Sequence, residues 1–387
     1  MHRDMQYDFA VVGCGGLIGS AALKYLSAEK HAVVGVGSPE PRDFSRHDDV
    51  FASHYDEARV TRVLDANPIW AGLAHESLQR FPEIRAGSGV SFYDTMGCLR
   101  VGEPETIARL AEVGTAFGAT FELLDNATLK DRFGFVESHD MVGVLERGRA
   151  GTLAPRALVR SQLTLARAHG AHVYEDVVIR IDTTAAGCTL HLKSGGQLNA
   201  GAVLVAAGAF TNFHDLLPVK LPMKAMPETV VLMPVPESLF AQNVPALLYY
   251  RWLNATASYL YATPPMRYED GRCYMKAGAL NDGIEVHSLA QAVDYFRSGG
   301  NRALALELAQ GARLAVPAMQ LDGFKIKPCI LANTATGLPY VSAVTPGRLY
   351  VAAGGCGAAA KSSDEIGRLA SELVLGRDAC EAFRLPA

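Results

Sequence analysis

The order of apolar and polar positions predicts a buried strand near the start of the chain, then a glycine-rich turn and a helix. Residues 7–20 read YDFAVVGCGGLIGS, an apolar run that breaks at Gly13. We expect the amphipathic segment Leu17–Leu26 to be the helix and the apolar run His31–Gly37 to be a second buried strand. Together these elements form a βαβ unit.

Two later blocks repeat this pattern of strand, glycine and helix. Within Gly148–Asn212, a loop leads into an amphipathic helix, then into a strand around His172–Ile181 and a hairpin with a Gly-Gly turn. The hairpin ends in VLVAAGAFTN, a buried strand that stops at glycine. Near the C-terminus, RLYVAAGGCGAAAKSSDEIGRLASELVLG gives a third strand, turn and helix. We expect the three blocks to share one discontinuous sheet.

The stretches between these blocks alternate aromatic and aliphatic residues, as in the run from Tyr249 to Tyr261. This pattern favours a second, mostly antiparallel sheet. We therefore expect an α/β fold in which a discontinuous Rossmann-like domain binds a dinucleotide and a second β-sheet domain binds the substrate. The first domain is assigned to residues 1–90, 150–220 and 325–387, and the second to residues 91–149 and 221–324.

The first glycine turn predicts a dinucleotide site, because it points the free amides and dipole of a helix N-terminus at a pyrophosphate. Its glycines are Gly13, Gly15, Gly16 and Gly19. The alternative is a purely structural strand-to-helix turn. The spacing departs from GxGxxG because Ile18 stands where the third glycine belongs. The acid that normally follows the second strand and binds the ribose is also not at its usual place. Glu40 is the only acid near the end of that strand, and it lies beyond Pro39.

Composition narrows the range of partners. The 387 residues are 49% apolar and 20% charged, and their net charge of −4 provides no basic field for nucleic acid or anionic lipid. No segment reaches about 18 consecutive apolar residues and no signal peptide precedes the first strand, so we expect a cytoplasmic protein without a membrane segment. Seven scattered cysteines without a CxxC pair argue against a disulfide framework or a metal site.

In this order the blocks resemble the FAD-dependent amine oxidoreductases of the D-amino acid oxidase superfamily, and within it the monomeric sarcosine oxidase and N-methyltryptophan oxidase branch. The likeness spans nearly the whole chain. It is carried by the N-terminal glycine turn and by ASHYDEARVTR, VLVAAGAFTN, KPCILANTATGLPYV and AAGGCGAAAKSSDEIG. The resemblance implies that the cofactor is FAD. Besides the four glycines and Glu40, it assigns to FAD binding Ser53, His54, Val178, Ala207, Gly208, Cys329, Gly354, Gly355 and Gly357.

Two arginines in ASHYDEARVTR are candidate site residues. Arg59 and Arg62 are three apart, and at the start of a helix both guanidiniums would leave on one side. The resemblance implies that Arg59 tunes the isoalloxazine ring and that Arg62 helps to hold a substrate carboxylate, which a planar guanidinium can bind with two hydrogen bonds. The alternative is a solvated helix face with ion pairs to Asp56 or Glu57.

Two lysines are candidates for the same site. Lys361 follows the small residues GGCGAAA, and the resemblance implies that it pairs with the substrate carboxylate. A lysine at the start of a helix is unfavourable because the helix dipole is positive there, unless an anion lies near. Lys276 lies in a predicted strand, GRCYMKAG, and its counterpart in the family promotes the reaction of reduced flavin with dioxygen. An exposed strand lysine is the alternative for Lys276.

Cys329 occupies the place of the cysteine that, in the resembled branch, forms a thioether with the flavin 8-methyl group. Attachment requires a thiolate, and we expect Lys325 and Lys327 to lower the pKa of the thiol. FAD covalently attached through Cys329 is thus implied, with a buried inert cysteine as the alternative.

The resembled family also has two active-site histidines, which by spacing fall at Leu280 and Ala358. Neither is histidine here. The pocket is therefore expected to be roomier and less polar than a sarcosine pocket, with Tyr261 as an aromatic wall or as a core tyrosine.

The resemblance implies oxidation of a C–N bond in an amino acid or related amine that carries a carboxylate. A hydride would pass to flavin N5, the imine would hydrolyse, and dioxygen or an unidentified acceptor would reoxidise the flavin. The alternatives are an FAD-dependent dehydrogenase with another acceptor, a nicotinamide-dependent dehydrogenase, and a flavin-binding subunit of a larger complex. We expect a monomer or small homo-oligomer.

Overall fold

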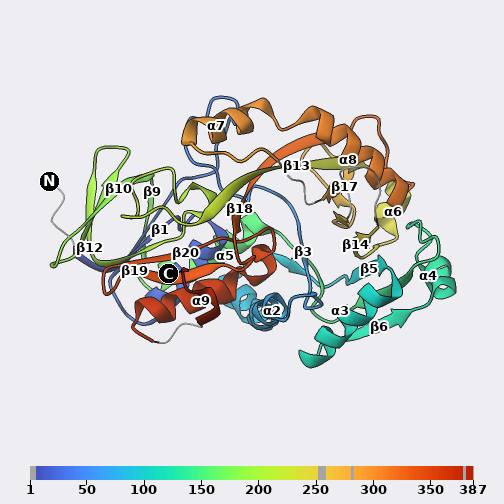
Figure 1. Ribbon diagram of the computed structural model, residues 1–387, viewed down its shortest axis with the longest axis horizontal. Coiled ribbons are helices and arrows are strands. Elements are labelled where there is room, and N and C mark those ends of the chain that lie inside the picture. The colour runs from blue at the N-terminus through green and yellow to red at the C-terminus, as the bar shows by residue number, and fades with distance from the viewer. Residues whose placement is uncertain (1–5, 252–258, 280–282, 378–380, 387) are drawn as a thin grey trace.

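The structure is a computed structural model that describes residues 6–251, 259–279, 283–377 and 381–386. Figure 1 shows two large sheets beside each other, one containing β1 and β12 and the other containing β13 and β17. Helices α2 and α9 lie along the first sheet, and α7 and α8 cover the second. The expected division into two β-sheet layers is therefore present.

The first sheet has parallel strands at its centre, as a Rossmann-like domain requires. Strand β1 pairs in parallel with both β2 and β12, and β20 from the C-terminal block pairs in parallel with β12. The three sequence blocks thus share one sheet. Its described strands are β1 (Gln6–Val12), β2 (Val33–Gly37), β9 (His172–Glu175), β10 (Val178–Thr183), β11 (Cys188–Leu192), β12 (Gln197–Val205), β19 (Tyr340–Thr345) and β20 (Leu349–Ala353).

The single strand expected around His172–Ile181 is wrong. Two strands, β9 and β10, occupy this segment and lie at opposite ends of the strand order β10-β11-β12-β1-β2-β9. The chain turns between them at Asp176, whose carboxylate accepts a hydrogen bond of 2.7 Å from Val177 N. An aspartate that bonds the next amide favours such a local turn over a continuing strand.

The second sheet is mostly antiparallel, as expected. Among its described strands, only the pair β5 and β14 is parallel. The members are β5 (Cys98–Gly102), β6 (Phe121–Leu124), β7 (Val142–Glu146), β13 (Met223–Pro234), β14 (Ala246–Tyr250), β15 (Leu260–Ala262), β16 (Met266–Arg267), β17 (Cys273–Gly278) and β18 (Lys325–Thr334). Strand β18 pairs along its whole length with β13. The domain boundary expected at 325 therefore divides the chain at the wrong point, since residues 325–334 belong to the second sheet.

A small sheet of β3 (Arg59–Thr61), β8 (Gly151–Leu153) and β4 (Tyr93–Asp94) lies apart from the two large sheets in the hydrogen-bonding pattern. The α-helices of the described chain are α1 (Leu17–Ala28), α2 (Pro68–Ser88), α3 (Pro104–Ala116), α4 (Asn126–Arg132), α5 (Pro155–Ala168), α6 (Glu237–Ala241), α7 (Leu289–Ser298), α8 (Arg302–Ala315) and α9 (Ser363–Val374). Short 3₁₀ turns cover Gly208–Phe210, Ala359–Ser362 and Glu381–Phe383.

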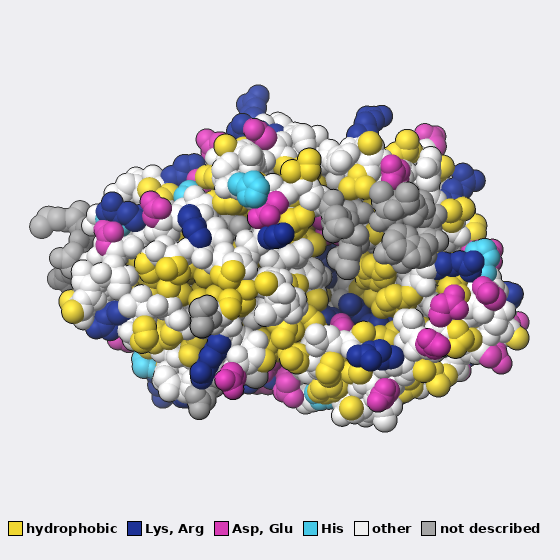
Figure 2. Space-filling view, in the orientation of Figure 1, with side chains coloured by type: hydrophobic (Ala, Val, Ile, Leu, Met, Phe, Trp, Pro, Cys, Tyr) yellow, Lys and Arg dark blue, Asp and Glu magenta, His cyan; other side chains and the backbone are white. Residues whose placement is uncertain are grey.

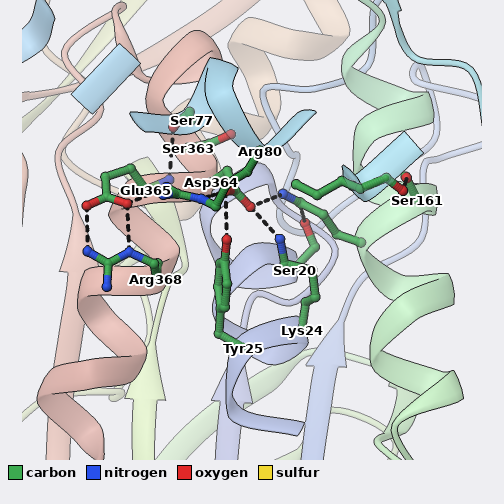
Figure 3. Close-up of polar contacts among 12 residues, drawn as sticks. Ser20, Lys24, Tyr25, Ser77, Arg80, Ser161, Ser363, Asp364, Glu365 and Arg368 are labelled. Atoms are coloured by element: carbon green, nitrogen blue, oxygen red, sulfur yellow. Dashed lines mark hydrogen bonds and ion pairs between the residues drawn. The ribbon is translucent and has the colours of Figure 1, made fainter. Parts of the chain in front are cut away.

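Helices α1 and α9 are held together by a buried polar network (Figure 3). Asp364 at the start of α9 accepts hydrogen bonds from Lys24 Nζ at 2.6 Å and from Tyr25 Oη at 2.8 Å, both on α1. It also accepts one of 2.9 Å from Arg80 Nε on α2. The backbones are close as well, because a Cβ added at Gly367 would lie 2.5 Å from Ala21 Cβ. A buried carboxylate with three donors is compensated for its burial, so the network stabilises the packing of α9 against α1 and α2.

None of the described helices is long and apolar enough to cross a membrane. The cysteines in the described ranges are all free thiols. No cluster of His, Cys, Asp and Glu residues suited to a metal ion occurs in that same part of the chain.

Candidate active site

A cavity of about 860 Å³ joins the first glycine turn to the second sheet. Figure 2 shows a hollow between the two halves of the molecule, with basic and acidic side chains visible inside it. Most residues that the sequence singles out line this cavity: Gly13, Gly15, Gly16, Ser53, Arg59, Arg62, Val178, Ala207, Gly208, Tyr261, Lys276, Cys329, Gly354, Gly355, Gly357 and Lys361. Gly19, Glu40 and His54 are not among its lining residues.

The glycine turn fits a diphosphate. Gly13 has a φ of 88°, and a Cβ at this residue would lie 2.4 Å from the carbonyl oxygen of Ala206. Gly16 is the N-cap of α1 and no side chain caps the helix, so its first amides face the cavity that Gly16 and Leu17 line. A helix N-terminus approached by bare backbone is an anion site, and the site therefore suits the diphosphate of a dinucleotide.

Gly19 packs closely against the backbone of the same turn. A Cβ at this position would lie 2.2 Å from the carbonyl oxygen of Gly13. Only glycine lets α1 start this close to the turn, so Gly19 shapes the site without lining it.

Glu40 is held by an arginine. Its two carboxylate oxygens lie 2.7 Å from Arg156 Nε and 2.6 Å from one terminal nitrogen of Arg156, whose side chain lines the cavity. The ribose contact expected of Glu40 remains a prediction.

His54 is a buried residue whose Nδ1 atom has no hydrogen-bond partner among the described residues. Burial lowers the pKa of the imidazole to about 4, so the ring is neutral at physiological pH. The preceding residue, Ser53, contributes its carbonyl oxygen, which accepts a 2.8 Å hydrogen bond from Arg59.

The expected helix at Arg59 and Arg62 is wrong. Arg59–Thr61 is strand β3, which pairs antiparallel with β8. Both guanidiniums nevertheless line the cavity, and each has its own acidic partner: Asp56 for Arg59 and Asp65 for Arg62. The ion pair to Asp56 that belongs to the alternative exists, but the Asp56 side chain is only 4% exposed, so the pair is not part of a solvated face.

The first of two charged clusters, hereafter the Asp56 cluster, consists of Asp56, Arg59 and Lys276. Asp56 Oδ2 accepts hydrogen bonds from Arg59 and from Lys276 Nζ, and Lys276 Nζ also donates to the carbonyl oxygen of Ala58 at 2.6 Å. Lys276 lies on β17 with its side chain only 1% exposed. The alternative of an exposed strand lysine is therefore excluded.

Burial sets the protonation of this cluster. Burial and the nearby Arg59 lower the pKa of Lys276 to about 8, while Asp56 acts in the opposite direction. Although burial favours the neutral carboxyl, Lys276 and Arg59 hold the pKa of Asp56 well below its ordinary value. The Asp56 carboxylate therefore faces Arg59 and Lys276 at neutral pH, with Lys327 3.9 Å from its other oxygen, and the cluster carries net positive charge.

The second cluster, hereafter the Asp65 cluster, consists of Arg62, Asp65 and Lys361. Lys361 Nζ lies 3.4 Å from Asp65 Oδ2, and Arg62 approaches the same oxygen at 3.7 Å. Arg62 Nε is buried and has no hydrogen-bond partner among the described residues. Burial and Arg62 lower the pKa of Lys361 to about 8, with Asp65 opposing the shift.

Two residues of the second sheet hold the backbone between Arg62 and Asp65. Glu146 accepts hydrogen bonds from Val63 N at 2.6 Å and Leu64 N at 3.0 Å. Arg100, only 1% exposed, donates to the Leu64 carbonyl oxygen. The Asp65 cluster is thereby fixed to strands β5 and β7 and does not depend on a free loop.

Cys329 lies on β18 directly opposite Glu228 of β13. Burial and Glu228 raise the pKa of its thiol to about 11, although Arg59 and Lys276 act in the opposite direction. The two lysines expected to activate the thiol are occupied, since Lys325 binds Asp270 and Lys327 lies 3.9 Å from Asp56. The expected lowering of the thiol pKa by these two lysines is therefore wrong.

Tyr261 lines the cavity beside Lys276, whose Nζ lies 5.9 Å from the ring centroid. Ala358, one of the two positions where the resemblance places histidine, also lines the cavity. The other position, Leu280, lies outside the described residues.

From the sequence, Asp56 is expected only as a partner on a solvated helix face, and Asp65, Arg100 and Glu228 are not singled out; all four line the cavity. Two of them carry a usable signal. Arg100 lies within the apolar strand CLRVG, and Glu228 directly precedes the apolar run TVVLMPV. A charged residue in a buried strand is costly unless it is paired and hydrogen-bonded, and such residues cluster at functional sites, so these positions are functional candidates.

Comparison with known sequences agrees with this geometry. Residues 8–373 match the DAO family, described as FAD dependent oxidoreductase. A monomeric sarcosine oxidase from Streptomyces avermitilis is 28% identical over 53% of this chain and 52% of its own length. One from Bacillus sp. is 24% identical over 61% of each chain. The aligned regions thus span only about half to three fifths of these relatives.

Solved structures match over almost the whole chain. NikD, an amino acid oxidase of nikkomycin biosynthesis, has a TM-score of 0.77 at 19% identity, covering 98% of this chain and 97% of its own. Glycine oxidase from Geobacillus kaustophilus has a TM-score of 0.72 at 20% identity, covering 98% of both chains. These likenesses show the same fold. With the family match over residues 8–373, this chain belongs to the DAO family of FAD-dependent oxidoreductases.

Proposed function

We propose that this protein oxidises a C–N bond in an amino acid or related amine that carries a carboxylate. The Asp65 cluster is the observation that supports the proposal. Arg62 and Lys361 share one acid, Asp65, and line the same cavity as the diphosphate turn. Buried cations in excess of their acids favour an anionic ligand.

Bound FAD supplies the two-electron acceptor for this chemistry. The protein residues bind the substrate carboxylate through Arg62 and Lys361, exclude water and hold the amine beside the Asp56 cluster. Loss of a hydride from the carbon next to the neutral amine leaves an iminium ion, and water converts this ion to a carbonyl compound, an amine and a proton. We propose that Lys276, a buried cation, promotes reoxidation by dioxygen through stabilisation of the developing negative charge.

The test is a screen of D-amino, N-methyl and cyclic amino acids with the flavin-loaded protein. Anaerobic bleaching of the flavin absorbance reports substrate oxidation, and hydrogen peroxide release in air reports reoxidation by dioxygen. Bleaching without peroxide would replace the oxidase proposal with a dehydrogenase that uses another acceptor. An unbleached flavin with every amine class would favour a subunit without its own activity. Equal peroxide rates in Lys276→Met and wild type would exclude the proposed role of Lys276.

A further inference from the structure

Glu228 is a buried carboxyl group on the cavity wall. It lies on β13, is 6% exposed and lines the cavity. Within the described part of the chain, no hydrogen bond or ion pair engages its carboxylate; its backbone carbonyl accepts a 2.7 Å hydrogen bond from Tyr295 Oη. The carboxylate thus has capacity for a donor from a ligand.

The titratable groups around Glu228 come from five other elements. Cys329 faces it from β18, and it interacts electrostatically with Arg59 of β3, Lys276 of β17, Tyr261 of β15 and Tyr295 of α7. Burial raises the pKa of Glu228 to about 7, with Arg59 and Lys276 opposing the shift. A carboxyl group with such a pKa exchanges its proton near neutrality.

The other two acids that line the cavity in these clusters are already engaged. Asp56 binds Arg59 and Lys276, and Asp65 lies between Arg62 and Lys361. Nearby cations lower the pKa of both carboxyls. Position 280 is leucine and position 358 is alanine, so neither can exchange a proton.

We infer that Glu228 binds the ammonium group of the substrate and accepts its proton, which selects substrates whose amine approaches this wall of the cavity. This inference rests on the proposed function. The step is a proton transfer alone: the ammonium N–H bond breaks, a carboxyl O–H bond forms, and the nitrogen keeps its electron pair. That pair is what later forms the second bond of the imine.

The test uses two inert carboxylates of the same shape, trimethylglycine and tert-butylacetate, which differ only in the positive charge of the former. Each is titrated into the flavin-loaded protein, and binding is read from the flavin absorbance. As Glu228 loses its proton between about pH 6 and about pH 9, the preference for trimethylglycine is expected to rise about tenfold. Glu228→Gln should abolish this rise at unchanged flavin content.

Lys276 and Lys361 also titrate in this range. Lys361 is proposed to bind the carboxylate that both probes share, so its titration should affect both alike. Lys276→Met serves as the control and should keep the rise that depends on Glu228. Glu228→Leu is the second variant if Glu228→Gln binds flavin poorly. The same pH-dependent preference in wild type and Glu228 variants would overturn the inference while leaving the carboxylate site intact. If neither probe perturbs the wild-type flavin at any pH, the proposed carboxylate site fails, and the inference fails with it.

Discussion

Lys276 Nζ lies 2.5 Å from Asp56 Oδ2, and the two side chains are only 1% and 4% exposed. They come from residues 220 positions apart in the sequence, one on β17 and the other in the loop before β3. Asp56 therefore joins β17 of the second sheet to Arg59 on β3. Its negative charge also reduces the net positive charge on this wall of the cavity.

Replacing Asp56 by asparagine should reveal this role. Asp56→Asn leaves Arg59 and Lys276 buried without a counter-charge, so we expect the free energy of unfolding to fall by about 3–5 kcal/mol, measured by urea denaturation. The pKa of Lys276 should fall further below about 8, because Asp56 opposes the shift. Glu57→Gln is the control, since the pair of Glu57 with Arg156 is about one third exposed and should be worth at most about 1 kcal/mol. Equal losses in both variants would contradict this role of Asp56.

Binding of a simple carboxylate should weaken as pH rises through about 8. The ordinary pKa of Lys361, 10.5, is lowered to about 8, so the ammonium is charged below this pH and neutral above it. We expect tert-butylacetate affinity, read from the flavin absorbance, to drop above about pH 8 by about tenfold. Lys361→Met should bind weakly at every pH and show no drop. Lys276→Met should retain the drop, although the pKa of Lys276 is also about 8. A drop that persists in Lys361→Met would assign the titration to another group.

Gly19→Ala should lower FAD content without unfolding the protein. The added Cβ would lie 2.2 Å from the Gly13 carbonyl oxygen and would push the turn away from its diphosphate-binding shape. The flavin-to-protein absorbance ratio of the purified variant measures the loss. Gly134→Ala is the control, because its nearest neighbour is the Lys130 carbonyl oxygen at 3.7 Å and the residue is exposed. Full flavin content in Gly19→Ala would show that the turn tolerates the shift.

Covalent attachment through Cys329 predicts a yellow pellet after acid denaturation of the flavin-loaded protein. Because the buried thiol has its pKa raised to about 11, attachment at neutral pH should be slow and should speed up as pH rises. Cys329→Ala should release all flavin to the supernatant, and Cys356→Ala, at another cavity-lining cysteine, should not. A yellow pellet from Cys329→Ala would place the linkage elsewhere, and a colourless wild-type pellet would show non-covalent FAD.

The sheet architecture could be predicted from the sequence because strands, glycine turns and helices leave local patterns. The first glycine turn, helix α1 and strand β20 all lie where the periodicity places them. The boundary at 325 could not be found in this way. Strand β18 precedes the last βα unit directly, and only its pairing with β13 assigns it to the second sheet.

The basic residues of the site were predictable because the resemblance supplies them, whereas the burial of their acidic partners was not. Asp56 and Asp65 lie near the arginines in sequence, where a solvated ion pair would give the same pattern. Their burial results from strands β5, β7 and β17, which are distant in sequence. The thiol environment of Cys329 was mispredicted for a related reason. The sequence neighbours Lys325 and Lys327 form ion pairs with Asp270 and Asp56. Glu228 on the adjacent strand β13 is the residue that faces the thiol.

The contact of Gly367 with α1 has a consequence for how this enzyme family diversifies. Helix α9 follows Lys361 directly, and α1 begins at the diphosphate turn, so the spacing between the two ends of the cavity is set where these helices touch. Any side chain at Gly367 would alter cofactor and carboxylate positions together. We therefore expect new substrate ranges to arise by exchange of side chains on β13, β14, β15 and β17. These side chains can change without moving the diphosphate turn or Lys361.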